Sequence, residues 1–217
     1  MTAGRKRAIP LAGLYVILDP SVRPERPLMD VLNAAAAAGV RLFQYRNKTA
    51  SMKDALAEAR PLRSRAQELN VLFLVNDRCD LALATNADGV HLGQADLPYA
   101  KARTILGAHK CIGLSTHNVE QVKRAEQLRP DYIGFGPIFT PGSKTDHDPV
   151  VGLEGLKSIR ALTSLPVFAI GGIHMQHVRP LLDAGADGIA VISAVVGASD
   201  VAAAATTFIE QMTSPIA

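Results

Sequence analysis

The sequence has little of what secreted and membrane-spanning proteins need. It contains two cysteines, Cys79 and Cys111, without CxxC spacing or a secretory context, which favours reduced thiols over a disulfide. No apolar run is long enough to span a bilayer, and no signal-peptide hydrophobic segment follows the basic residues at 5–7. These features predict a cytoplasmic protein that contacts no membrane.

Aromatic residues and excess charge are also scarce. Aromatic residues make up 5% of the chain, and its formal net charge is +3 at pH 7. Nucleic-acid binding relies on clustered positive charge and on rings that stack against bases, so this composition argues against it. The mild positive excess would instead help to attract a small phosphorylated substrate.

The chain does have enough length and apolar content for one substantial core, with 217 residues of which 48% are hydrophobic. Eight short apolar runs alternate with amphipathic helical segments. The runs cover residues 15–19, 42–46, 72–76, 89–93, 112–116, 132–137, 167–171 and 188–193. Each run is continuous, which is typical of parallel strands covered on both faces.

Helical patterns separate these runs at residues 28–38, 51–70, 98–106, 118–128, 153–162, 175–184 and 200–212. Eight β-α units without a long structureless insert favour an α/β fold, a single-domain (β/α)8 TIM barrel, over an open doubly wound sheet. We expect a tail at residues 1–12 and the barrel at residues 13–213. Nearly the same phrase occurs at 86–90 and 185–189, which indicates either a duplicated half-barrel or one helix-to-strand turn used twice.

Polar residues gather where the predicted strands end, and in such a barrel the working face lies at the C-terminal strand ends. The second run ends in Gln44, Arg46 and Lys48, which share one orientation because strand side chains alternate. The third run ends in Asn76 and Asp77. These residues are candidates for binding a ligand, although Asp77 could equally cap the next helix.

Asp96 strengthens the case for Asp77 because it lies in the loop after the adjacent strand. Two carboxylates beside Arg46, Lys48 and Lys144 suit a hard cation. Magnesium is usually held by one or two carboxylates plus substrate phosphates. The sequence therefore predicts a Mg²⁺ site that binds well only together with its substrate.

The remaining strand ends indicate a second anion site. Gly172 belongs to a glycine pair after the seventh run, and Ser193 follows the eighth, which matches the phosphate site of such barrels. Ser115, after the fifth run, could offer a hydroxyl group to a phosphate or a ring substituent. His91 is expected to be a packed strand residue, and His117 is as readily structural as catalytic.

Residues 131–139 read as a buried strand that opens into a polar loop at 140–144. Pro137 has no N–H for a sheet, so the strand should stop near it. The loop offers backbone amides, the Ser143 hydroxyl and the Lys144 ammonium group, a chemistry that holds an anion. A monophosphate site facing a more highly charged site, such as one for a diphosphate, indicates transfer with diphosphate as the leaving group.

Eight ordered motifs resemble the thiamine phosphate synthase family, over residues 15 to about 194. They are QYRNK at 44–48, ND at 76–77, HLGQAD at 91–96, GLSTH at 113–117, GFGPIF at 134–139, SK at 143–144, AIGGI at 169–173 and VIS at 191–193. The resemblance implies joining 4-amino-5-hydroxymethyl-2-methylpyrimidine diphosphate to 4-methyl-5-(2-hydroxyethyl)thiazole phosphate. It also implies that the C–O bond breaks first and that the thiazole nitrogen captures the resulting pyrimidine methylene cation.

The resemblance also implies residue roles. The pyrimidine diphosphate would be held by Gln44, Arg46, Lys48 and Asn76, and magnesium by Asp77 and Asp96. The pyrimidine substrate would also contact Ser115 and Lys144. The thiazole phosphate would be held by Pro141, Gly142, Ser143, Gly172, Ile192 and Ser193. Of these, Arg46, Lys48, Ser115 and Lys144 would be catalytic, and the loop at 142–152 would act as a lid.

Two residues depart from the family pattern. Tyr45 stands where an aliphatic residue is common, and Pro141 stands where threonine is usual, with Thr140 one place early. The Pro141 departure puts one hydroxyl contact to the thiazole side in question, while Ser143 keeps the second. The chain offers no general base, and the dissociative mechanism needs none.

Three other functions remain as alternatives. A thiazole tautomerase would share the barrel and its phosphate site without a magnesium or diphosphate site. A different phosphate-handling isomerase would need an acid/base pair, and a non-catalytic phosphate sensor would need no metal pair. The combination of cations and carboxylates favours the transferase, and the sequence leaves open whether the chain forms a homo-oligomer.

Overall fold

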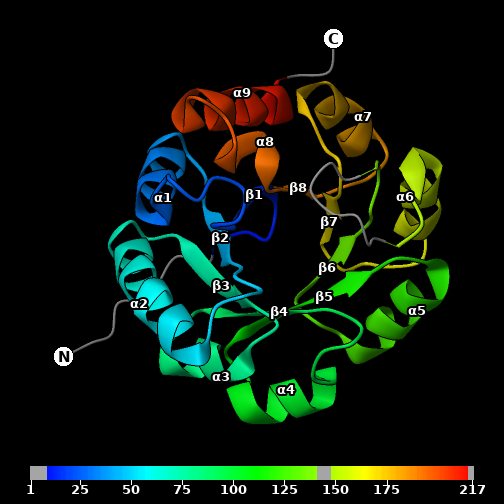
Figure 1. Ribbon diagram of the computed structural model, residues 1–217. Coiled ribbons are helices and arrows are strands. Elements are labelled where there is room, and N and C mark those ends of the chain that lie inside the picture. The colour runs from blue at the N-terminus through cyan, green and yellow to red at the C-terminus, as the bar shows by residue number, and fades with distance from the viewer. Residues whose placement is uncertain (1–8, 141–147, 215–217) are drawn as a thin grey trace.

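Eight parallel strands form a closed barrel in a computed structural model that describes residues 9–140 and 148–214. The strands are β1 (Gly13–Leu18), β2 (Leu42–Tyr45), β3 (Leu72–Asn76), β4 (Gly89–Leu92), β5 (Cys111–Thr116), β6 (Tyr132–Phe135), β7 (Val167–Ile170) and β8 (Gly188–Val191). Each strand pairs with the next in chain order, and β8 pairs with β1. The predicted (β/α)8 TIM barrel is confirmed, and Figure 1 shows the ring of helices around it.

The helices cover the outside of the barrel. They are α1 (Leu28–Ala37), α2 (Met52–Glu68), α3 (Cys79–Ala84), α4 (Tyr99–Leu106), α5 (Val119–Leu128), α6 (Gly152–Arg160), α7 (Val178–Asp183), α8 (Ser193–Val196) and α9 (Val201–Thr213), with a 3-10 turn at Met175–His177. The helical patterns named from the sequence include the range of neither α3 nor α8, because helices this short do not display an amphipathic period. The single helix predicted at 175–184 is instead the 3-10 turn followed by α7.

Strand β6 is shorter than the predicted run at 132–137. It ends at Phe135, two residues before Pro137, which has no N–H to donate to a neighbouring strand. The Gly136 N–H still bonds the Thr116 carbonyl at 3.2 Å. The chain therefore leaves the sheet at Gly136 and enters the loop that leads toward α6.

The core has two layers. The larger layer fills the space between strands and helices, and the smaller layer fills the barrel interior around Tyr15, Tyr132 and Phe168. These three rings pack edge to face with centroids 5.3–5.9 Å apart. A Cβ atom at Gly113 would lie 2.1 Å from the Tyr132 ring, and one at Gly188 would lie 2.3 Å from the Phe168 ring. Glycine at these positions makes room for the interior aromatic residues.

Three aspartates fasten the N-terminal end of the barrel, each directly before an even-numbered strand. Each carboxylate accepts a backbone hydrogen bond from the preceding strand and pairs with an arginine of an even-numbered helix. The sets are Asp88 with Phe73 and Arg63, Asp131 with Ile112 and Arg103, and Asp187 with Val167 and Arg160. Because Asp131 has this role outside the repeated phrase, the structure favours one turn used repeatedly over a duplicated half-barrel.

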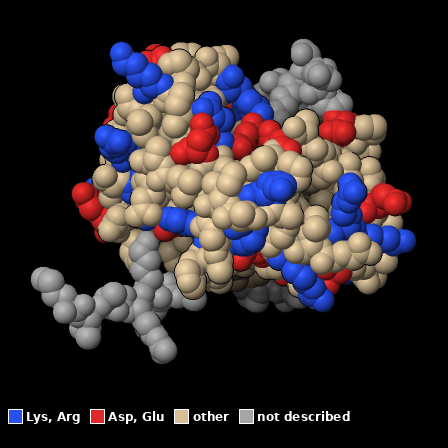
Figure 2. Space-filling model, turned by 90° about the horizontal axis from the view of Figure 1, so that it is seen from below, with Lys and Arg blue, Asp and Glu red and all other residues tan. Residues whose placement is uncertain are grey.

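The surface carries charges of both signs (Figure 2), and the two cysteines are free thiols. Lysine, arginine and acidic side chains are interspersed over the face shown in Figure 2. Within the described ranges, no helix has both the length and the apolar character needed to cross a membrane. Cys79 and Cys111 are both free, which confirms that they form no disulfide with each other.

Candidate functional site

A cavity of about 80 Å³ opens inside the barrel at the C-terminal strand ends. We call it the strand-end cavity. Five of the predicted ligand residues line it: Gln44, Arg46, Asn76, Ser115 and Ile192. They lie on or directly after β2, β3, β5 and β8, so closure of the barrel brings together residues that are far apart in the chain.

Arg46 is held by an ion pair with Asp19, a residue that the sequence prediction omits. Asp19 directly follows β1, is only 3% exposed, and also accepts hydrogen bonds from the backbone N–H and hydroxyl of Ser21 at 3.0 and 2.6 Å. A guanidinium group has five N–H donors, so Arg46 can hold Asp19 and still donate to an anion. The rule that located the other strand-end residues also applies to Asp19, which ends the predicted run at 15–19.

The structure brings the carboxyl groups of Asp77 and Asp96 close enough to interact. Asp77 follows β3 with a φ of 61°, and its N–H donates to the His91 carbonyl at 2.8 Å. Asp96 accepts a 2.6 Å hydrogen bond from the Gly93 N–H. Burial, followed by the hydrogen bond with Asp77, raises the pKa of Asp96 above its ordinary value.

The chemistry of these donors fits a hard cation. Asp77 also forms an ion pair with Lys48, so the carboxylate pair already attracts positive charge. Among the residues that the structure describes, no group of three or more histidine, cysteine, aspartate or glutamate side chains could hold a metal. A metal on Asp77 and Asp96 would therefore need further ligands, and Mg²⁺ commonly takes them from substrate phosphates and water.

Five side chains form a hydrogen-bonded chain across the barrel interior, which we call the interior chain: Gln44, Tyr15, Tyr132, His91 and Ser115. The successive distances are 2.6 Å from Gln44 Nε2 to Tyr15 Oη, 2.9 Å to Tyr132 Oη, 2.9 Å to His91 Nδ1, and 2.9 Å from His91 Nε2 to Ser115 Oγ. Burial lowers the pKa of His91 to about 4, so its ring is neutral at neutral pH. His91 lies on β4, but it contacts the strand-end cavity with both ring nitrogens bonded.

The glycine pair after β7 lets the loop after β6 approach closely. Gly171 and Gly172 have φ angles of 99° and 60°, which side-chain-bearing residues rarely adopt. A Cβ atom at Gly172 would lie 2.6 Å from the Thr140 carbonyl oxygen, and the Phe139 N–H donates to the Gly171 carbonyl at 3.0 Å. Ser193 begins α8 directly after β8. The predicted phosphate residues Gly172, Ile192 and Ser193 thus lie after two adjacent strands.

The predicted residues Pro141, Gly142, Ser143 and Lys144 lie outside the described residues, as does most of the predicted lid. The described end of that loop is attached to the barrel through Val151, whose N–H donates to the Pro137 carbonyl at 2.9 Å. His117 bonds the Gly136 carbonyl through Nδ1 at 2.6 Å, and its Nε2 lies 3.4 Å from Asp148. His117 therefore has a structural role in joining β5 to this loop.

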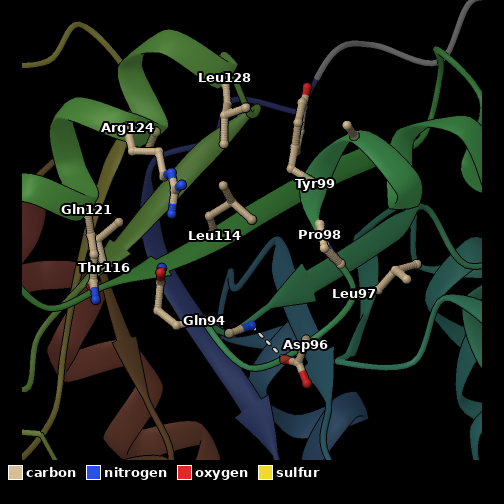
Figure 3. A pocket seen from close by; sticks show the side chains of 13 residues that line it. Gln94, Asp96, Leu97, Pro98, Tyr99, Leu114, Thr116, Gln121, Arg124 and Leu128 are labelled. Carbon is tan, nitrogen blue, oxygen red and sulfur yellow. Dashed lines mark hydrogen bonds between the residues drawn. The ribbon is translucent and has the colours of Figure 1, made fainter.

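A second hollow of about 360 Å³ lies outside the barrel, between α4 and α5 (Figure 3). Leu114, Tyr99, Leu128 and Arg124 surround it, and Asp96 lies at its edge with the hydrogen bond from Gly93 drawn as a dashed line. Gln94 connects the hollow to the strand-end cavity, because its Nε2 donates to the Ser115 carbonyl at 2.6 Å.

Comparisons with known proteins find relatives that match nearly the whole chain. The family model for thiamine monophosphate synthase matches residues 14–195. A thiamine-phosphate synthase of Moorella thermoacetica is 41% identical over 94% of this chain and 98% of its own length. One from Chloroflexus aurantiacus is 45% identical over 88% of each chain. The solved structure of a thiamine phosphate pyrophosphorylase from Pyrococcus furiosus has a TM-score of 0.84 and 38% identity, and covers 94% of this chain and 98% of its own.

Proposed function

The chain belongs to the thiamine monophosphate synthase family, which makes it a transferase, and we propose that it makes thiamine phosphate from two phosphorylated substrates. One is 4-amino-5-hydroxymethyl-2-methylpyrimidine diphosphate, and the other is 4-methyl-5-(2-hydroxyethyl)thiazole phosphate. The observation that carries the proposal is the contact between Asp77 and Asp96 beside a cavity lined by Gln44, Arg46 and Ser115. A diphosphate substrate needs such a combination of carboxylates for a metal and cations for phosphate oxygens.

The reaction proceeds by ionisation followed by capture. The C–O bond to the diphosphate breaks with both electrons leaving on oxygen, and the thiazole nitrogen then donates its lone pair to the methylene carbon. Asp77 and Asp96 would hold Mg²⁺, which would supply positive charge for the departing diphosphate. Arg46 and Lys48 add cationic N–H donors, and Lys144 would add another.

The role of Lys48 in this proposal depends on its ion pair with Asp77. Its ammonium group is paired with Asp77, so with a metal held by Asp77 the Lys48 side chain would be free to donate to the phosphate oxygens. Arg46 differs, because its partner Asp19 is buried and is not one of the two proposed metal ligands. Arg46 would therefore stay oriented, while Lys48 would respond to a metal on Asp77.

Protection of the methylene cation from water is the second requirement. The strand-end cavity has apolar walls that include Ile17, Phe168, Ile170 and Ile192. The loop at 142–152 would cover the opening as a lid. Gly172, Ile192 and Ser193, with residues 141–143, would hold the phosphate of the thiazole substrate through backbone amides and hydroxyl groups.

The cellular setting in the proposal follows the sequence predictions. The protein acts in the cytoplasm on small phosphorylated molecules and binds neither nucleic acid nor a membrane.

The metal pair provides the test of this function. Asp77→Asn keeps the size of the side chain and removes its charge, so turnover in Mg²⁺ should fall by at least about 100-fold with the fold intact. Thiamine phosphate formation measured by mass spectrometry checks this. Asp80→Asn is the matched control, because Asp80 is exposed and paired with Arg78 outside the cavity. Near wild-type turnover by Asp77→Asn would contradict the metal assignment.

A further inference from the structure

Only one arrangement of protons in the interior chain gives both buried tyrosine hydroxyl groups an acceptor for their protons. We propose that this arrangement fixes the polarity of the strand-end cavity, with Ser115 presenting its hydroxyl proton and Gln44 presenting its carbonyl oxygen. Tyr15, Tyr132 and His91 would then be positioning residues that set this polarity. The chemical class of the ligand rests on the proposed function, whereas the polarity itself rests on hydrogen-bond geometry alone.

The direction starts at Gln44. Its Nε2 carries only protons, so the Tyr15 oxygen must accept this 2.6 Å hydrogen bond. Tyr15 is 1% exposed, and within the described residues its hydroxyl group bonds only Gln44 and Tyr132. A buried hydroxyl proton without an acceptor is costly. Tyr15 therefore donates its proton to the Tyr132 oxygen.

The direction continues through Tyr132 and His91. Tyr132 is fully buried and already accepts from Tyr15, so its own proton goes to His91 Nδ1 at 2.9 Å. A bare Nδ1 places the single ring proton of a neutral imidazole on Nε2. His91 Nε2 therefore donates to Ser115 Oγ at 2.9 Å, and the Ser115 proton remains for the cavity.

The reverse direction fails at Tyr15. If His91 carried its proton on Nδ1, it would donate to Tyr132, and Tyr132 would donate to Tyr15. Tyr15 would then accept from both Gln44 and Tyr132. Its own proton would have no acceptor among the described residues, at a side chain that is only 1% exposed.

The resulting polarity selects a class of ligand. An acceptor on Gln44 and a donor on Ser115 complement a planar ring that carries an amino group beside a bare ring nitrogen. An aminopyrimidine has that pattern. An oxo analogue presents a carbonyl oxygen and a ring N–H instead, so its carbonyl oxygen would face the Gln44 oxygen and the Ser115 hydroxyl proton would lose its acceptor. We therefore expect the 4-oxo analogue of the pyrimidine substrate to be rejected by about 100-fold or more in kcat/KM.

The tautomer of His91 in the full-length wild-type protein tests the polarity without any substrate. Long-range ¹H–¹⁵N correlation spectra of the ¹⁵N-labelled protein distinguish the two ring nitrogens, and loss of signals in His91→Gln identifies the residue. The expected result is a protonated Nε2 and a bare Nδ1. A protonated Nδ1 would overturn the proposal, whether or not the protein proves to be a synthase.

Tyrosine variants test the functional consequence. Tyr132→Phe and Tyr15→Phe keep the packed rings but break the interior chain, so kcat/KM for the pyrimidine diphosphate should fall about tenfold. The KM for thiazole phosphate should stay within about twofold, and His91 in Tyr132→Phe should become a mixture of tautomers. Tyr99→Phe is the matched control, because its hydroxyl group bonds the Arg129 carbonyl outside the barrel. Unchanged kcat/KM in both interior variants would overturn the positioning role.

Discussion

At the scale of single residues, burial shifts the pKa values of two groups near the C-terminal ends of the strands, His91 and Asp96. His91 has an imidazole whose pKa burial lowers to about 4, whereas the ordinary histidine value is 6.5. Burial has the opposite effect on the pKa of Asp96, which it raises, because burial disfavours the charged form of a carboxyl group. The charged form of each group is disfavoured, and a metal ion would reverse this at Asp96 by stabilising the carboxylate.

The His91 pKa predicts how stability depends on pH. In the folded state His91 stays neutral down to about pH 4, while in the unfolded state it takes a proton near pH 6.5. The unfolded state thus binds more protons between these values, and stability is lost as pH falls from about 6.5 toward 4. Between pH 7 and pH 5 this group should remove about 2 kcal/mol from the free energy of unfolding.

Urea unfolding at pH 7 and pH 5 measures that loss. His91→Gln cannot take a proton, so it should lose about 2 kcal/mol less than the wild type across the same range. Equal losses in the two proteins would show that His91 is charged in the folded state.

At the scale of elements, the three aspartates before β4, β6 and β8 join strand to strand and helix to barrel. The Asp187 carboxylate accepts from the Val167 N–H at 2.8 Å, while its ion pair with Arg160 is partly exposed. The backbone hydrogen bond should therefore matter more than the ion pair, because exposed pairs contribute little. Loss of the carboxylate would leave the N–H at the start of β7 without its acceptor.

Replacing Asp187 tests the contribution of its hydrogen bond with the Val167 N–H. Asp187→Ala should lower the free energy of unfolding by about 1–2 kcal/mol, as judged by urea denaturation. Asp183→Ala removes an exposed ion pair with Arg179 on α7 and should change stability by less than about 0.5 kcal/mol. Equal effects of the two variants would mean that the ion pairs, and not the backbone hydrogen bond, determine the stability.

Elements differ in how well the sequence predicts them. Continuous apolar runs locate all eight strands because both faces of a closed parallel barrel are buried. The range of helix α3 is not located from the sequence, because its six residues are too few to show a period. Asp19 could have been predicted from its place at a strand end. The contact between Tyr15 and Tyr132 could not, since it joins residues 117 positions apart and depends on the register of the closed barrel.

At the scale of the whole molecule, the barrel places two sets of functional groups at the C-terminal ends of its strands. Carboxylates and cations follow β1 to β4, and a glycine pair and a hydroxyl group follow β7 and β8. The interior chain lies between them and connects β2, β1, β6, β4 and β5. This order would suit the two anionic substrates of the proposed reaction, with the pyrimidine ring over the interior chain.

Release of diphosphate tests the central claim most directly. Inorganic diphosphate would be measured after mixing the protein with the pyrimidine diphosphate, with and without thiazole phosphate and Mg²⁺. The account predicts release that depends on Mg²⁺ and thiazole phosphate, with one thiamine phosphate formed for each diphosphate. Absence of release, despite binding of thiazole phosphate, would contradict the account and favour a thiazole tautomerase.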